Sequence, residues 1–205
     1  MTEIIGKIDF RVERIARQSP STTTAECPHF DAAAEKTLIA TAISAGKAVV
    51  GVCLGAQLIG EALGVPCEHS PKKEIGKFPI ILTEAGLGHD KFARLGRSLE
   101  VGHWHSDMPG LTPEAMVIAY SEGCPRQIIE YSTLVYGLQC HMEFNPEVVE
   151  LLIAHSEEEL ASLADHRYVQ QPTALRQNDY LLMNEMLFGF LDKLVQEYQA
   201  HACVA

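Results

Sequence analysis

One short stretch constrains the fold of this chain more than any other part of it. The apolar run 47–52, KAVVGV, leads through a glycine-flanked cysteine into residues 54–64, which have helical spacing. The run is too short and too rich in β-branched residues for a helix, and it lacks polar alternation, so we predict a strand buried on both faces. A strand, a tight turn and a helix form half of a βαβ unit. The sequence therefore predicts an α/β fold with a mixed, mostly parallel sheet flanked by helices.

The segments on either side support this fold class. Asp31 is a predicted N-cap for a helix over 32–46, and Asn145 is a predicted N-cap for a helix over 146–164. A last helix with an apolar stripe is predicted over 175–199. The stripes of the last two helices are expected to pack in the core, through Leu151, Leu152, Leu160, Leu181, Leu182, Met186, Leu187 and Phe190. Between these helices lie short strand-like segments separated by turn residues, and strands in a row indicate an antiparallel or meandering section. These segments are 78–83, 99–105, 115–121, 126–132 and 134–141.

Bulk composition narrows the function classes. The 205 residues, 47% of them hydrophobic, suit a single domain with a substantial core. The net charge of −11 provides no broad basic face for phosphate backbones, so nucleic acid is not an expected partner. No apolar run approaches membrane-spanning length and residues 1–14 are charged throughout, so we expect a cytoplasmic protein without a membrane segment. The six scattered cysteines form no CxxC pair, which argues against a disulfide framework and against a thiolate zinc site.

The glycines around Cys53 have the G-x-C-x-G spacing of a nucleophile elbow, in which a strained strand-to-helix turn lifts the central side chain into a pocket. A helix N-terminus favours a thiolate, and the backbone N–H of Leu54 would point to the place where an oxyanion forms. A buried structural cysteine in a glycine-rich turn fits this stretch equally well. The nucleophile interpretation requires a base elsewhere in the chain.

The candidate base is His141, in the segment GLQCHME at 137–143. If this segment continues as an extended strand end, residues two apart point to the same side. Glu143 could then hold the imidazole of His141 while the imidazole faces the thiol, which is the arrangement of a catalytic triad. A structural histidine and a solvated carboxylate are the alternatives at these two positions.

Four motifs in this order resemble the class I, triad-type glutamine amidotransferases, most of all the stand-alone members similar to the amidotransferase domain of GMP synthase. The motifs are G-x-C-x-G-x-Q at 51–57, KKEIG at 72–76, WHSD at 104–107 and G-L-Q-x-H-x-E at 137–143. The resemblance extends from about Ser19 to about Glu150. It implies the flavodoxin-like fold of that family, glutamine or a γ-glutamyl compound as the substrate, and no cofactor.

The resemblance also implies a role for each matching residue. Cys53 would attack the side-chain amide of glutamine, release ammonia and leave a γ-glutamyl thioester, while His141 shuttles the proton and Glu143 orients it. The residues implied to hold or surround the substrate are Leu54 through its N–H, Gln57, Glu74, Gly76, and the backbone of Trp104 and His105. Structural alternatives stay open: Gln57 as a solvated first-turn residue, Glu74 as a loop charge, and Trp104 as a core aromatic. A purely structural role fits Gly76 equally well.

The front of the chain departs from the family pattern. Family members begin with a buried strand and a helix and reach a Gly-Gly loop that donates a second oxyanion N–H, whereas this chain has Ile15 and Ala16 where that pair is expected. Charged residues also replace the apolar strand before it. We therefore expect residues 1–18 to form an atypical segment, as an N-terminal truncation would leave it, and 19–205 to form one amidotransferase-like domain without the first strand-helix unit. An uncovered sheet edge would favour a homodimer.

Other functions stay open beside glutamine hydrolysis. Segment 103–107, HWHSD, has the H-x-H-x-D spacing of dinuclear zinc hydrolases, but Met108 stands where that pattern continues with histidine, so we expect no metal site. Loss of one oxyanion donor typically costs on the order of a hundredfold in rate and would leave a binding or regulatory module. Some members of the family resemble γ-glutamyl peptidases or hydrolases. No P-loop pattern for ATP is present, so an acceptor of ammonia would be a separate synthase or partner protein.

Overall fold

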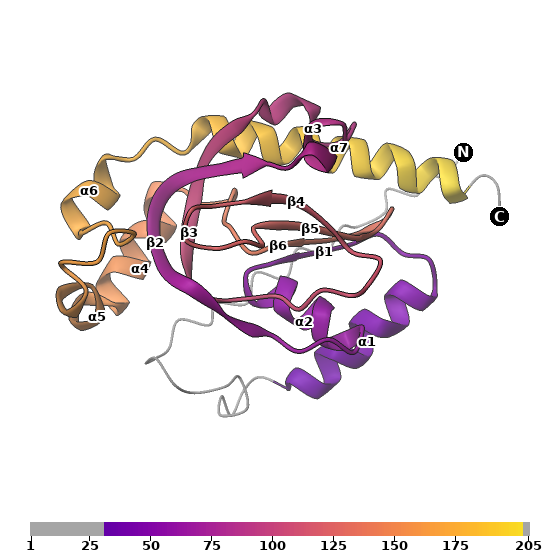
Figure 1. The fold of residues 1–205 in the computed structure, drawn as a ribbon, viewed down its shortest axis with the longest axis horizontal. Helices are drawn as coiled ribbons and strands as arrows, with labels where there is room; N and C mark the ends of the chain where they lie inside the picture. The colour runs from indigo at the N-terminus through magenta and orange to yellow at the C-terminus, as the bar shows by residue number, and fades with distance from the viewer. Residues whose placement is uncertain (1–30, 203–205) are drawn as a thin grey trace, which may run out of the picture.

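The computed structural model describes residues 31–202, and every structural statement below refers to this part of the chain. Its fold is mixed α/β, with one curled six-stranded sheet between helices (Figure 1). The strands are β1 (Val49–Val52), β2 (Glu68–Leu82), β3 (Ser98–Met108), β4 (Met116–Tyr120), β5 (Ile128–Ser132) and β6 (Val135–Leu138). The helices are α1 (Ala32–Ser44), α2 (Leu54–Ala62), α3 (Glu84–Leu87), α4 (Pro146–His155), α5 (Glu157–Ser162), α6 (Pro172–Gln177) and α7 (Leu181–Ala202), with a 3₁₀ turn, η2 (Ala93–Leu95).

The strand order is β1-β6-β5-β4-β2-β3, and the mixture of strand directions differs from the prediction. The mixed α/β sheet is confirmed, but the expectation that it is mostly parallel is wrong for the described strands. Only β1 and β6 pair in parallel, whereas β2–β3, β2–β4, β4–β5 and β5–β6 are antiparallel. The connections between β4, β5 and β6 are short, and short connections can join only antiparallel neighbours. The predicted meandering section therefore makes up most of the sheet.

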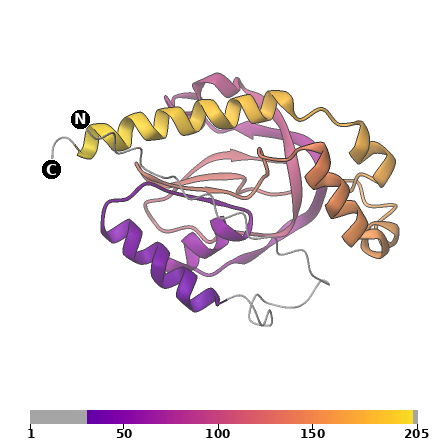
Figure 2. The same ribbon diagram turned by 180° about the vertical axis from the view of Figure 1, so that it is seen from behind.

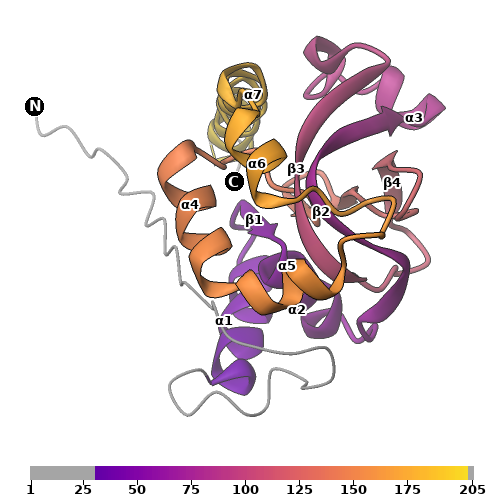
Figure 3. The ribbon, with the colours of Figure 1, turned by 90° about the vertical axis from the view of Figure 1, so that its left-hand side faces the viewer.

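Helices cover both faces of the sheet. Helices α1 and α2 lie on one side and the long α7 lies on the other, as opposite views show (Figures 1 and 2). The two faces bury separate clusters: Ile59 of α2 packs with Ile129, whereas Phe190 of α7 packs in the larger cluster that contains Ile128. Adjacent residues of β5 thus point to opposite faces, as the strand period of two requires. Helices α4, α5 and α6 gather beside the curved part of β2 (Figure 3).

Local signals placed the helix starts correctly. The side chain of Asp31 accepts hydrogen bonds from the N–H groups of Ala33 and Ala34, both at 3.0 Å, and begins α1. The side chain of Asn145 accepts from the N–H of Val148 at 2.8 Å and begins α4. Each cap satisfies N–H groups that have no acceptor within the helix, which is why both residues end the preceding segment.

Both long C-terminal helices that we predicted are wrong in extent, because each is interrupted. The helix over 146–164 breaks at Ser156, and α5 then starts with three consecutive glutamates, which favour a new helix N-terminus. The helix over 175–199 breaks between α6 and α7, where Asn178 is extended and Asp179 Oδ1 accepts from the N–H of Leu181 at 3.0 Å. Asn and Asp side chains compete with helical hydrogen bonds, and here they end one helix and start the next.

The apolar stripes of these helices are only partly in the core. Leu160 and Phe190 are 1% exposed, as expected, and the prediction is confirmed for them. It is wrong for Leu151, which is 36% exposed, and for Leu181 and Leu182, which are 71% and 56% exposed. The break before α7 turns its first residues outward, and Met183 is the first residue of the helix that is buried.

Strand β2 begins at Glu68, well before the predicted start at Phe78. Its polar first half pairs with β3, and Glu74 lies opposite His105 while Gly76 lies opposite His103. This half has no run of apolar residues, so hydrophobic patterning did not reveal it. Glu74 therefore lies within a strand and not in a loop.

The predictions for residues 1–18, including the missing first strand-helix unit and its oxyanion loop, lie outside the described residues. Between residues 31 and 202, none of the helices combines the length and the apolar character needed to span a membrane. Four cysteines fall in this range, and all four are free thiols: Cys53, Cys67, Cys124 and Cys140.

Candidate active site

Cys53 lies at the turn between β1 and α2 in a strained backbone conformation. Its φ of 52° and ψ of −109° make it the one non-glycine residue with positive φ in the described part of the chain. The turn is tight because a Cβ on Gly51 would lie 2.3 Å from the carbonyl carbon and oxygen of Gly55. Such strain at an L-residue is typical of a nucleophile elbow. A Cβ on Gly55 would meet nothing within 4 Å, so only the first of the two glycines is required by space.

The N-terminus of α2 faces the same turn. The N–H groups of Ala56 and Gln57 bond to the carbonyl of Cys53, and no acceptor within residues 31–202 faces the N–H of Leu54. Unpaired N–H groups and the helix dipole together stabilise negative charge near a helix N-terminus. The geometry suits an anionic sulfur or an oxyanion beside it.

His141 and Glu143 form a close pair behind the sulfur. Nδ1 of His141 lies 2.5 Å from Oε1 of Glu143, and the imidazole lies close enough to Cys53 for the sulfur to affect its pKa. Burial alone would lower the pKa of His141, but the Glu143 carboxylate and the Cys53 sulfur raise it to about 10. Burial would raise the pKa of Glu143, and the neighbouring His141 lowers it instead. The raised pKa favours the protonated imidazole at neutral pH, with the Glu143 carboxylate as its acceptor.

The backbone around His141 fixes the direction of its ring. Its N–H and carbonyl form a two-bond bridge with Gly102 of β3, at 2.7 and 2.9 Å. The ring stacks on Phe144, with centroids 4.2 Å apart. A Cβ on Gly102 would lie 2.5 Å from Cδ2 of Phe144, so glycine is needed there for the close approach. The imidazole is thus held from two directions before any substrate arrives.

Two further groups contact the sulfur of Cys53. The carbonyl oxygen of Trp104 lies 4.0 Å away, and the amide nitrogen of Gln139 lies 3.5 Å away. The oxygen of that amide accepts from Nε2 of Gln57 at 3.0 Å. Gln57 and Trp104 were candidate site residues, but Gln139 was not. The alternation that selected His141 also places Gln139, two residues earlier, on the same side, and this signal could have identified it.

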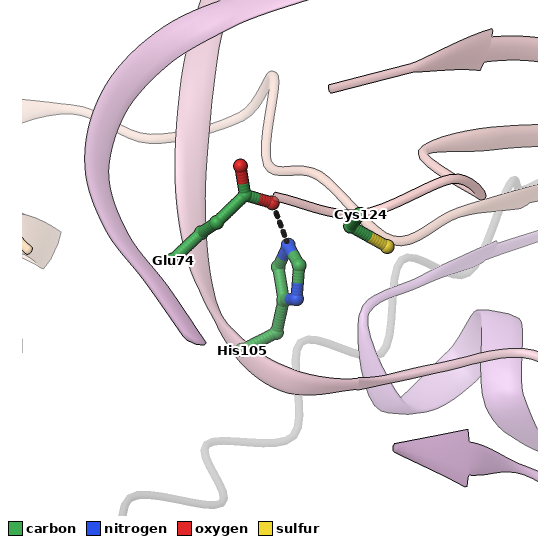
Figure 4. Close-up of side chains that lie close together, drawn as sticks. All are labelled: Glu74, His105 and Cys124. Atoms are coloured by element: carbon green, nitrogen blue, oxygen red, sulfur yellow. Dashed lines mark ion pairs between the residues drawn. The ribbon is translucent and has the colours of Figure 1, made fainter. Parts of the chain in front are cut away.

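Glu74 and His105 lie together in a buried polar cluster (Figure 4). Glu74 is 1% exposed and accepts from Ser121 Oγ at 2.8 Å and from Gln127 Nε2 at 2.7 Å. Its Oε2 lies 3.4 Å from Nε2 of His105. Burial raises the pKa of Glu74 and lowers the pKa of His105, which disfavours the charged form of each. The contacts of Glu74 tie β2 and β3 to the loop after β4, and none of them reaches Cys53.

Glu74, His105 and Cys124 could hold a metal ion, because their donor atoms lie within 4.8 Å of one another (Figure 4). The amide nitrogen of Gln127 already lies among these atoms, 2.7 Å from Oε2 of Glu74 and 3.2 Å from Nε2 of His105. The amide of Gln127 therefore already contacts the donor atoms that Glu74 and His105 would offer to an ion.

The H-x-H-x-D spacing does not converge on one point. Nε2 of His103 faces the carbonyl of Phe78 at 3.2 Å, and burial lowers the pKa of His103 to about 3. Asp107 turns elsewhere and pairs with His69 at 2.6 Å. The two histidines and the aspartate therefore lack the common focus that a zinc site requires.

Gly76 has a φ of +136°, a conformation that favours glycine. A Cβ there would lie 2.7 Å from the side chain of Gln170. That side chain accepts from the N–H of Lys77 at 3.0 Å, and the N–H of Gln170 donates to the carbonyl of Ile75 at 2.8 Å. Gly76 thus allows the segment after α5 to dock on β2.

Comparisons with known proteins agree with this geometry. The family described as glutamine amidotransferase class-I matches residues 20–178, a range that contains Cys53, His141 and Glu143. The glutamine amidotransferase-like protein YfeJ of Salmonella typhimurium is 56% identical over 177 residues, which cover 86% of this chain and 74% of that protein. One subunit of the glutamine-hydrolyzing GMP synthase of Pyrococcus abyssi is 33% identical over 118 residues, or 57% of this chain and 58% of that protein.

Among solved structures, the crystal structure of SMU.1228c resembles this chain with a TM-score of 0.82 and 50% sequence identity. The superposed part covers 87% of this chain and 76% of that chain.

Proposed function

Because this chain belongs to the class-I glutamine amidotransferase family, we propose that it hydrolyses the side-chain amide of glutamine and releases ammonia. The observation that carries the proposal is the position of His141, which lies 2.5 Å from the carboxylate of Glu143 and close enough to Cys53 for the sulfur to raise its pKa. A nucleophile, a base and a group that orients the base are the minimum for covalent acyl transfer.

The first half-reaction begins with Cys53 as a thiolate and His141 as an imidazolium. The sulfur attacks the amide carbon of glutamine, and the negative charge moves to the carbonyl oxygen. The N–H of Leu54 is the donor available to that oxygen within the described residues. When the carbon–nitrogen bond breaks, the proton of His141 passes to the leaving nitrogen, which departs as ammonia.

The second half-reaction returns the enzyme to its starting state. Neutral His141 takes a proton from water, and the resulting hydroxide attacks the carbonyl carbon of the γ-glutamyl thioester. The carbon–sulfur bond breaks, glutamate leaves, and the thiolate of Cys53 again faces a protonated imidazole. Glu143 stabilises each protonated state of His141 and holds the ring in place. These steps need no cofactor.

The substrate would lie between the turn of Cys53 and the adjoining part of β3. Gln57 and the backbone of Trp104 and His105 are the proposed contacts of glutamine. The 4.0 Å separation of the Trp104 carbonyl from the sulfur of Cys53 supports this role for the segment. Glu74 and Gly76 would support this β3 segment without contacting glutamine. Glu74 would do so through the ring of His105, and Gly76 through the docking of Gln170 on β2.

We propose that the released ammonia passes to an acceptor held by a separate protein. The similarity to one subunit of a glutamine-hydrolyzing GMP synthase supports a synthase protein as the partner. We expect this partner to cover the face where Cys53 opens, so that ammonia passes to it directly.

Turnover of two substrates tests the proposal. Ammonia release from glutamine and glutamate release from a γ-glutamyl peptide are measured with the unaltered protein, Cys53→Ala and Cys67→Ala. We expect ammonia release that Cys53→Ala abolishes and Cys67→Ala preserves. If only the peptide is turned over, the protein is a γ-glutamyl hydrolase and the proposal is wrong. Absence of Cys53-dependent turnover of either compound would contradict it and favour a binding module.

A further inference from the structure

Two glutamine side chains form a chain of hydrogen bonds that ends at the nucleophile. Nε2 of Gln57 donates to Oε1 of Gln139 at 3.0 Å, and Nε2 of Gln139 donates to the sulfur of Cys53 at 3.5 Å. Gln139 is fully buried, at 0% exposure, so its amide groups depend on these partners. The catalytic triad does not use these two hydrogen bonds.

The chemistry of the sulfur determines the orientation of both amides. A thiolate can only accept hydrogen bonds, so Gln139 must turn its NH₂ group toward Cys53. Its oxygen then faces Gln57, which must donate its own NH₂ group in return. This arrangement leaves Oε1 of Gln57 free to accept a hydrogen bond from a bound molecule. An anionic sulfur would thus fix two side chains that could otherwise flip.

The backbone of Gln139 is anchored beside the nucleophile. Its N–H donates to the carbonyl of Gln127 at 2.8 Å, and the carbonyl of the preceding residue, Leu138, accepts from the N–H of Cys53 at 2.7 Å. The side chain therefore starts from a fixed point next to the turn. An anchored donor costs little entropy when it bonds to a charged group.

We propose that Gln139 is a catalytic residue outside the triad, which stabilises the anionic sulfur of Cys53 by an N–H···S hydrogen bond and fixes the amide of Gln57 toward the substrate. The second role rests on the proposed function, in which Gln57 contacts glutamine. The first role concerns only the sulfur and does not depend on which substrate is used. His141 and Gln139 would then hold the thiolate from two sides.

Spectroscopy of the thiolate tests the first role without any substrate. Thiolate absorbance assigned to Cys53, taken as the difference from Cys53→Ala, is measured at neutral pH for Gln139→Met and Gln139→Glu. Methionine fills the same space without the donor, and glutamate replaces the donor with an acceptor. We expect lower absorbance in Gln139→Met and still lower absorbance in Gln139→Glu. The control is Gln171→Met, which removes an amide that donates to the carbonyl of Leu160, and it should leave the absorbance unchanged.

Kinetics with glutamine test both roles. Loss of the hydrogen bond to the charged sulfur, which is the first role, should lower kcat of Gln139→Met by roughly 10- to 100-fold. A double-mutant cycle with Gln57 tests the second role. Gln57→Met should chiefly raise KM. If Gln139 orients Gln57, the double variant has a KM no higher than the worse of the two single variants. Circular dichroism and thermal unfolding of each variant exclude loss of the fold as the cause.

The outcomes separate this inference from the proposed function. Unchanged absorbance in both Gln139 variants, or effects on KM that multiply in the double variant, would overturn the corresponding role of Gln139 even if glutamine is hydrolysed. Lower absorbance in a protein that does not hydrolyse glutamine would support the N–H···S bond and contradict the proposed function alone.

Discussion

Nδ1 of His141 and Oε1 of Glu143 lie 2.5 Å apart, and this contact sets the charge of the imidazole that faces Cys53. The two residues are two positions apart in the chain and follow the end of β6, where His141 bridges to Gly102 and Glu143 lies in a bend. The pair is therefore built by local geometry, whereas its approach to Cys53 depends on the parallel pairing of β1 with β6.

Glu143→Gln should lower kcat/KM for glutamine by roughly 100-fold or more, since loss of the orienting carboxylate in other triads costs at least that much. Glutamine keeps the size of the side chain and removes its charge. Steady-state kinetics measure the effect, and Glu147→Gln, which alters an exposed carboxylate on α4, is the matched control. Equal activity of the two variants would remove Glu143 from the site.

The same pair predicts a pH-dependent stability. Folding raises the pKa of His141 from 6.5 to about 10. Protonated His141 therefore stabilises the fold fully below about pH 6.5, and this stabilisation is lost as the pH rises through about 10. Urea unfolding should give a higher free energy of unfolding for the unaltered protein than for Glu143→Gln. This difference should narrow as the pH rises from about 6.5 to about 10. A difference that is constant or widens with pH would contradict the raised pKa.

The two glycines of the elbow should respond differently to alanine. Gly51→Ala would place a Cβ 2.3 Å from backbone atoms of Gly55, and we expect it to lower the free energy of unfolding by about 2 kcal/mol or more. Gly55→Ala meets nothing within 4 Å and should change that free energy by less than about 1 kcal/mol. Denaturant titration of both variants tests the tight turn. Equal losses would show that space at Gly51 does not limit the turn.

The cysteines should differ in their rate of alkylation by iodoacetamide at neutral pH. Burial raises the pKa of the Cys67 thiol to about 11 and that of the Cys140 thiol well above its ordinary value, so few of these thiols are ionised. We expect Cys53 to react before Cys67, Cys124 and Cys140. Peptide mapping over time, in a Cys27→Ser/Cys203→Ser background, measures the order. Unfolding in urea should abolish this difference in rate between the cysteines. A faster reaction at Cys67 than at Cys53 in the folded protein would count against the nucleophile elbow.

Two phenylalanines of α7 provide a matched test of packing. Phe190 is 1% exposed and stacks on Phe92 with ring centroids 5.0 Å apart, whereas Phe188 is 64% exposed. Phe190→Ala should lower the free energy of unfolding by about 3 to 5 kcal/mol. Phe188→Ala should change it by less than about 0.5 kcal/mol. Similar losses in urea unfolding would mean that α7 packs through a different face.

Parts of this structure follow directly from short-range rules. The caps at Asp31 and Asn145 each depend on one side chain and the helix that follows it. The positive φ of Cys53 agrees with the elbow predicted from G-x-C-x-G spacing, because the strain lies within five consecutive residues. At these positions the neighbouring residues alone were sufficient to predict the local structure.

Other parts required knowledge of which segments meet. The polar half of β2 is a strand because β3 pairs with it, and no apolar pattern marks that half. Gln139 contacts Cys53 because β6 pairs with β1, although its alternation with His141 can be seen in the sequence. The exposure of Leu181 depends on where the predicted helix is interrupted before α7. Tertiary pairing decides the first two of these cases, and single-sequence patterning does not contain it.

Labelling by a chloroketone analogue of glutamine tests the central claim most directly, because it requires both a nucleophilic Cys53 and a pocket for the glutamine side chain. We predict that the analogue attaches to Cys53, identified by peptide mass mapping, and that added glutamine slows the reaction. His141→Ala should slow it as well. Attachment to another cysteine, or labelling of Cys53 at a rate that glutamine does not change, would contradict the account.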